Sequence, residues 1–226
     1  MQKLISLTVL VIVLAGLAFG GAAAQSSQPS SKVTAAVSSI TILQPAEGET
    51  DWTTILSNNL KTPNQKDLFV DVSLECGLYT DTLVKSAGGT KDTAKAEAGV
   101  YVQVLVDDVP MYPGEVVFCR RTQTLTALFG GILNCTDTYG DGVITVDECT
   151  LTPEELELVL DTMNANSFNF VLDDLGPGVH TVAVQARIST KEEAGAGMAD
   201  AKATIGKGSV TVESVRMIKN EDFLLE

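Results

Sequence analysis

The chain has 226 residues, a formal net charge of −14, four cysteines and one histidine. An acidic surface repels nucleic acid phosphates, so we do not expect DNA or RNA binding. The chain is rich in Val, Leu, Ile and Thr, a composition that excludes disorder throughout and favours β-strands.

The first 24 residues have the order of a secretory signal peptide. Met1-Gln2-Lys3 is weakly basic, residues 4–20 are almost wholly apolar, and Ala22-Ala23-Ala24 offers small residues before a cut at Gln25. Residues 25–32 are polar and linker-like. We therefore expect a secreted protein, extracellular or periplasmic, with no membrane attachment after cleavage. A retained anchor is the alternative, because the apolar run approaches the ~20 residues that span a bilayer.

All four cysteines lie beyond this leader, and an even number in an oxidising compartment predicts disulfides. Three pairings exist. We favour Cys135–Cys149, which closes a short loop, together with Cys76–Cys119, which joins two expected strands. Zinc is disfavoured, because no C-x-x-C is present and His180 is the only histidine.

Short segments of alternating polarity follow one another from Val33 onward. The clearest have one apolar face, such as Leu68, Val70, Val72, Leu74 and Cys76. Expected strands are 39–43, 67–76, 98–106, 115–119, 122–129, 167–172, 179–189, 201–205 and 209–218. Loops are expected at 86–92, 107–114 and 191–197.

One helix is expected, near 153–165. Thr152-Pro153-Glu154-Glu155 matches a helix start, with a capping Thr and a Pro at the first helical position. Leu156, Val159, Leu160 and Met163 then recur at helical spacing.

This pattern predicts a mainly β fold, in which residues 33–226 form a single two-sheet antiparallel sandwich with one inserted helix. The segment Gly176-Pro-Gly-Val-His-Thr-Val-Ala-Val-Gln-Ala186 resembles late strands of extracellular immunoglobulin-like and jelly-roll modules. That resemblance concerns fold class and implies no particular function.

The best candidate for a ligand site is the segment from Asp137 to Glu148, which looks like the twelve-residue calcium loop of EF-hands and dockerins. The resemblance assigns ligands to Asp137, Asp141, the Val143 carbonyl and Glu148. Tyr139 stands where a further Asp or Asn ligand is expected, and no convincing helix precedes the loop. The alternative is a plain hairpin turn stapled by Cys135–Cys149.

Other chemistry-bearing residues have simpler structural explanations. His180 starts a strand on its apolar face, where a structural histidine is expected. Asp107-Asp108 and Asp173-Asp174 adjoin turns, although acid pairs also serve glycosidases. The residues that could stack on a sugar ring are Trp52, Tyr79, Tyr101, Tyr112 and Tyr139.

No nucleophile is paired with a base in the sequence, so no catalytic site is assigned. The leading expectation is a non-catalytic binding or adhesion module for a glycan or a surface partner. The first alternative is a subunit of a surface layer or filament, in which the Val33–Leu43 strand adds to a neighbour's sheet. The second alternative is a calcium-dependent hydrolase that uses Asp or Glu.

Overall fold

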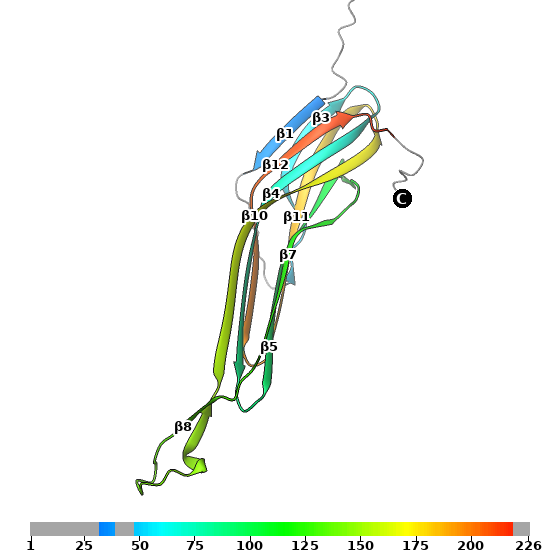
Figure 1. Cartoon of the computed structure of the whole chain (residues 1–226). Coiled ribbons are helices and arrows are strands. Elements are labelled where there is room, and N and C mark those ends of the chain that lie inside the picture. The colour runs from blue at the N-terminus through cyan, green and yellow to red at the C-terminus, as the bar shows by residue number, and fades with distance from the viewer. Residues whose placement is uncertain (1–31, 39–47, 219–226) are drawn as a thin grey trace, which may run out of the picture. The chain divides into compact units, whose positions relative to one another are not determined.

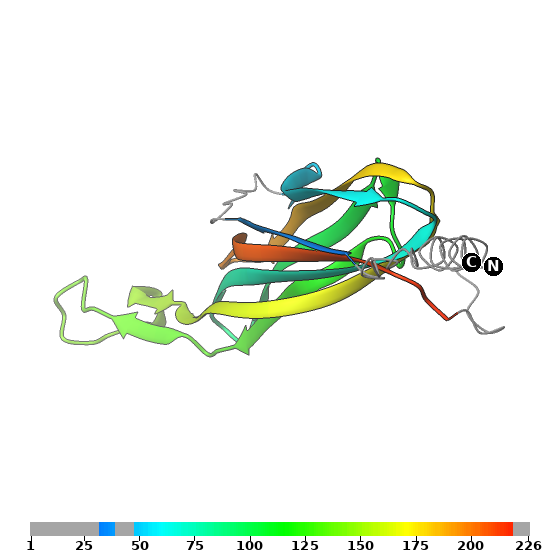
Figure 2. The same ribbon diagram turned by 90° about the horizontal axis from the view of Figure 1, so that it is seen from above.

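The computed structural model describes residues 32–38 and 48–218, which belong to the unit Ser31–Glu226. The expected leader, most of the expected linker and the expected strand 39–43 lie outside the described residues. Two antiparallel sheets pack face to face and form a mainly β sandwich, as the sequence predicts. Figure 2 shows the sheets as two layers.

The first sheet, sheet A, has the strand order β1-β12-β4-β10. Its strands are β1 (Lys32–Ser38), β12 (Met198–Val215), β4 (Lys66–Ser86) and β10 (Glu154–Leu175). β4 lies in the middle and pairs with β12 on one side and with β10 on the other. β10 is therefore an edge strand, and Figure 1 shows it along the margin of the sheet.

The second sheet, sheet B, is built on β11 (Gly178–Ala194) and β5 (Lys91–Val106), which pair with each other. β11 also pairs with β3 (Thr53–Thr62) and with the two-residue β2 (Gly48–Glu49). On its other side β5 pairs with β7 (Val116–Leu128) and with the short β6 (Val109–Pro110). β7 thus borders sheet B on the side where β10 borders sheet A.

The core lies between the sheets and consists of the faces predicted to be apolar. Residues 68, 70, 72, 74 and 76 of β4 are buried, and so are residues 100, 102, 104 and 106 of β5. Residues 182, 184, 186 and 188 of β11 pack against them. The period of two in the sequence therefore identified the inner faces correctly.

The helix predicted near 153–165 is wrong. This segment is strand in the structure, and β10 runs without a break in its pairing from Glu154 to Leu172 against β4. The apolar residues Leu156, Leu158 and Leu160 also recur with a period of two, and the structure uses that period. A continuous ladder with a long neighbouring strand outweighs the weak local preference for a helix.

Other strand boundaries also differ from those expected, because the strands are longer and more continuous than the local sequence pattern indicates. The two strands expected at 201–205 and 209–218 are a single β12 with a register shift after Ile205, where the Glu75 carboxylate accepts the Lys207 N–H at 3.0 Å. The strands expected at 115–119 and 122–129 are likewise a single β7, and β11 continues into the expected loop as far as Ala194.

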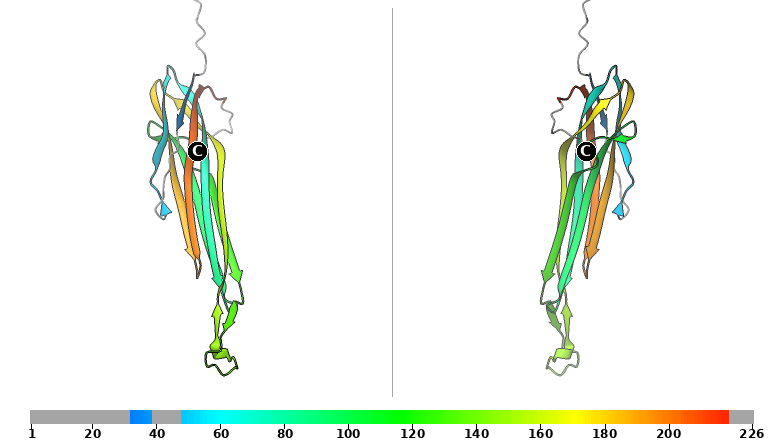
Figure 3. Two further views of the ribbon diagram at one scale, coloured as in Figure 1. Left: turned by 90° about the vertical axis from the view of Figure 1, so that its left-hand side faces the viewer. Right: turned by 90° about the vertical axis from the view of Figure 1, so that its right-hand side faces the viewer.

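A separate two-stranded hairpin consists of β8 (Ile132–Cys135) and β9 (Cys149–Thr152), with the 3-10 turn η1 (Val146–Glu148) before β9. Figure 3 shows it beyond the turn that joins β4 to β5, where the Gly88 N–H donates to the Gly130 carbonyl at 2.9 Å. In the described residues, no helix has the length and apolar character needed to cross a bilayer.

Candidate functional site

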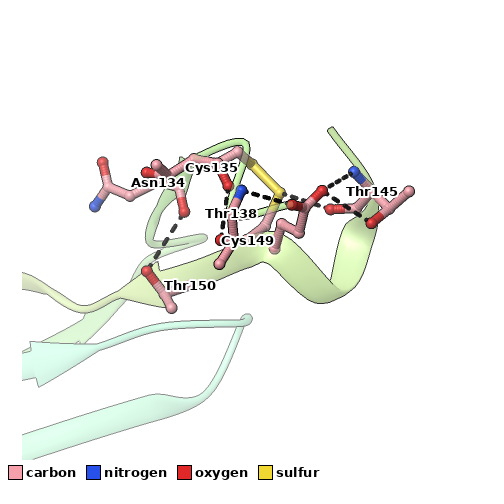
Figure 4. Close-up of a disulfide and its surroundings, with 8 residues drawn as sticks. Asn134, Cys135, Thr138, Thr145, Cys149 and Thr150 are labelled. Atoms are coloured by element: carbon pink, nitrogen blue, oxygen red, sulfur yellow. Dashed lines mark hydrogen bonds between the residues drawn. A yellow bond between two sulfur atoms is a disulfide. The ribbon is translucent and has the colours of Figure 1, made fainter. Parts of the chain in front are cut away.

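The segment with the calcium-loop pattern lies at the tip of the β8–β9 hairpin. Cys135 and Cys149 face each other across the ladder and are joined by a disulfide (Figure 4). Within the loop, the two Asp137 carboxylate oxygens accept the N–H groups of Gly140 at 2.6 Å and Gly142 at 2.9 Å. Asp141 accepts the Val143 N–H at 2.9 Å. The glycine positions allow the left-handed backbone that this tight turn requires, with φ of 67° at Gly140 and 80° at Gly142.

Glu148 closes the loop from the other end. Its carboxylate accepts the N–H groups of Thr145 at 2.9 Å, Thr138 at 2.7 Å and Tyr139 at 3.2 Å, and the Thr145 hydroxyl donates to it as well. These bonds, led by that from the Thr145 N–H, hold the pKa of Glu148 below its usual range. The side chain therefore organises the loop as a charged acceptor.

The structure does not bring the expected ligands together around a common point. Asp137, Asp141 and Glu148 each bind backbone N–H groups, and the described residues include no cluster of three His, Cys, Asp or Glu suited to a metal ion. Calcium binding stays a prediction. To bind the ion, these carboxylates would have to give up their hydrogen bonds to backbone N–H groups. A thermal midpoint that rises in millimolar calcium and falls again with chelator would support it. An unchanged midpoint would contradict it.

The same loop presents apolar side chains to solvent. Val146 is 88 % exposed and Tyr139 is 72 % exposed, and Val143 and Ile144 are exposed as well. A loop fixed by a disulfide and by at least six backbone-to-carboxylate hydrogen bonds loses little freedom on binding. These properties are typical of a recognition loop.

His180 makes the kind of contacts expected of a structural histidine. Its Nδ1 lies 2.7 Å from Asp107 Oδ2, and its Nε2 lies 3.0 Å from the Gly176 carbonyl oxygen. The hydrogen bond with the ring is the main cause that lowers the pKa of Asp107, which also accepts the Thr181 N–H. The ring thereby ties the β5–β6 turn to the start of β11.

The acid pairs considered for hydrolysis occupy tight backbone positions. Asp107 and Asp108 are the two turn residues between β5 and β6, with φ of 50° and 68°. Asp173 and Asp174 lie at the register shift of β10, where the Asp174 N–H donates to Asp67 at 3.0 Å. The second Asp67 oxygen accepts the Met217 N–H at 2.7 Å. Turn and bulge geometry thus accounts for these residues.

Three of the aromatic rings considered for sugar stacking already face a cation. The Arg187 guanidinium lies 5.3 Å from the Trp52 ring centroid and 4.7 Å from that of Tyr101, and it pairs with Glu49 and Glu115. Lys202 lies 5.2 Å from the Tyr79 ring centroid. Each of these cation–π contacts occupies one face of its ring.

The exposed edge of β10 is a feature that the sequence reasoning missed. Apolar side chains on both faces of the strand are open to solvent: Leu156, Leu158, Val159, Leu160, Met163 and Phe168. Side chains of β7 bind the inner face of β10. Arg121 donates to the Leu160 carbonyl at 3.0 Å, and Gln123 donates to the Leu158 carbonyl at 2.6 Å. The alternation of Leu156, Leu158 and Leu160 was the signal that could have revealed the strand.

Comparisons with known proteins place the chain in no family. No family model matches it, and no curated protein matches it. Among solved structures, the infectious bursal disease virus Gt strain aligns at 11 % identity with a TM-score of 0.17, over 86 % of this chain and 43 % of that one. The VP2 subviral particle of the same virus aligns at 10 % identity with a TM-score of 0.15, over the same shares. The chain thus spans less than half the length of these proteins, and the likeness is too weak to bear on function.

Proposed function

We propose that this protein is a secreted, non-catalytic β-sandwich module that binds a partner through one segment, Leu128–Phe168. One observation carries the proposal. In the described part of the chain, 14 of the 20 exposed large hydrophobic residues come from these 41 positions. Solvent-exposed apolar surface concentrated in one segment marks interaction sites. The segment contains the disulfide-fixed loop and most of the edge strand β10.

A protein surface fits this segment better than a glycan. The exposed residues of the loop are mainly aliphatic, with Tyr139 as the single aromatic ring. Sugar sites use several ring faces, and three candidate rings elsewhere each have a cation over one face. Apolar side chains on a rigid loop suit a partner that offers an apolar depression.

Secretion is part of the proposal. It is supported by the apolar leader pattern and by two disulfides, which persist in oxidising compartments. Intact-mass analysis of protein from the culture medium should give a chain that begins at Gln25 with all four cysteines oxidised. A reduced chain that keeps Met1 and stays in the cytosol would contradict it.

Substitutions in the loop test the binding function. Replacing Val143, Ile144 and Val146 by Ser removes exposed methyl groups without touching the core. We expect labelled protein to bind the surface of its producing cells at least about tenfold more weakly, since three apolar contacts are lost. The matched control replaces Val109, Val117 and Val179 by Ser. These residues are also exposed but lie outside the segment Leu128–Phe168. Equal loss in both variants would contradict the proposal.

Assembly by strand addition is a second candidate, and the open edge of β10 favours it. The expected donor strand is already used in part, because β1 pairs with β12 of its own chain from Lys32 to Ser38. β10 offers an acceptor edge instead. A capped peptide of alternating Val and Lys should add to this edge and slow amide exchange at the outward-facing residues of β10. Exchange that is unaffected by saturating peptide would contradict strand addition.

A further inference from the structure

The outer side of β10 is open over most of its length. Val171 exchanges two 3.0 Å hydrogen bonds with Tyr112, so Val171 points its backbone groups away from β4. Since backbone direction alternates along a regular ladder, the odd-numbered residues from Glu155 to Asn169 also point outward. Within residues 32–38 and 48–218, no strand pairs with this side. Natural proteins normally cover or blunt an edge of this length.

The two halves of this edge differ in charge. Glu155, Glu157 and Asp161 lie in the first half, together with Glu154 at its start. No charged residue occurs from Thr162 to Leu172. A strand that runs in the opposite direction, has the same sequence and is centred near Thr162 would therefore place each acid beside a neutral residue. A parallel copy would place each acid beside its own equivalent, which is destabilising.

We infer that a second copy of this chain pairs antiparallel with β10, with the two-fold axis at Thr162. This inference rests on the strand-addition function proposed above. In this register Glu155 lies opposite Asn169 of the second copy, Glu157 opposite Ser167, and Leu156 opposite Phe168. All eight outward-facing residues are used, and the ladder is about 50 Å long at 3.4 Å per residue. The two copies of sheet A then form one continuous sheet.

A strand from a basic partner is the main competitor, and charge separates the two. The lysines of such a partner strand would complement the acids in the first half of the β10 edge only, because the second half carries no charge. Each copy carries a net charge of −14, so two copies repel each other at long range. Self-pairing should therefore strengthen as salt is added, whereas a lysine-bearing strand should bind more weakly.

Sedimentation equilibrium of the purified protein and of Ser167 variants tests the register. Ser167→Glu places an acid opposite Glu157 twice per dimer, and we expect dimerisation to weaken by roughly tenfold or more. Ser167→Lys is the matched control and should dimerise at least as well as wild type. Within one chain, position 167 lies directly opposite Ser73 of β4, with Asp71 and Glu75 diagonally on either side. Urea unfolding of both variants therefore measures the change in monomer stability separately from dimerisation. Adding Glu157→Lys to Ser167→Glu should restore the dimer.

Two results would overturn the inference. One is a wild-type protein that stays monomeric from micromolar to millimolar concentration. The other is a dimer that Ser167→Glu leaves unchanged. A monomer whose β10 edge still accepts the Val-Lys peptide would refute self-pairing and leave strand addition standing. A monomer that ignores the peptide would refute both.

Discussion

Glu148 shows how one side chain can determine the form of a loop. Its carboxylate accepts three backbone N–H groups, and these bonds lower its pKa. A group whose pKa is lowered on folding contributes stability above its unfolded pKa, and that stability is lost as pH falls through the folded pKa. We expect the loop to loosen in acid, with the Glu148 carboxyl titrating below the range usual for Glu in an NMR titration. In Glu148→Gln the loop should be loose at neutral pH already. An ordinary Glu titration would contradict this role.

Asp108 is a residue whose replacement should stabilise the fold. Asp107 and Asp108 both have positive φ in a two-residue turn, the geometry of a type I′ hairpin. Asp-Gly is a preferred pair for that turn, so Asp108→Gly should raise stability by about 0.5 kcal/mol, the relief of strain minus the entropy cost of glycine. Urea unfolding measures the change. Asp108→Ala keeps the strained backbone and should be less stable than Asp108→Gly; the reverse order would contradict the turn assignment.

At the scale of elements, the sequence predicted inner faces well and strand continuity poorly. The alternation in β4, β5 and β11 marks residues buried on one side, so periodicity was sufficient there. In β10, Thr152-Pro153 and the spacing of Leu156, Val159 and Leu160 imitate a helix start. The decisive interaction is a ladder with β4, about 80 residues earlier in the chain, which no local pattern can report.

The same limit applies to the candidate site. The cysteine pairing could be inferred from spacing. The occupation of Asp137 and Glu148 by backbone N–H groups could not be inferred, because it depends on the three-dimensional course of the loop.

The turn between β11 and β12 depends on a glycine. A Cβ atom on Gly197 would lie 1.7 Å from the Leu83 carbonyl oxygen, which is backbone and cannot rotate away. We expect Gly197→Ala to destabilise the protein by roughly 2 kcal/mol in urea unfolding. Gly176→Ala is the control, since a Cβ there meets nothing within 4 Å. Similar stabilities for the two variants would contradict the close approach.

For the whole molecule, the two disulfides should contribute differently. Cys76 lies on β4 of sheet A and Cys119 on β7 of sheet B, so this bond links the two layers. Cys135–Cys149 closes only the β8–β9 hairpin. Replacing Cys76 and Cys119 by Ser should lower global stability by about 2–4 kcal/mol in calorimetry and urea unfolding. Replacing the other pair should loosen the hairpin and lower global stability less. The opposite order would contradict the layer assignment.

Strand addition and the self-pairing of two copies both depend on β10 as an edge strand with an open outer side. Residue-resolved amide exchange of dilute protein is the most direct measurement of that geometry. The prediction is alternation from Glu155 to Asn169, with slow exchange at even-numbered residues, which face β4, and fast exchange at odd-numbered residues. Uniform protection over residues 153–165, as in a helix, or slow exchange at the odd-numbered residues of the monomer would contradict it.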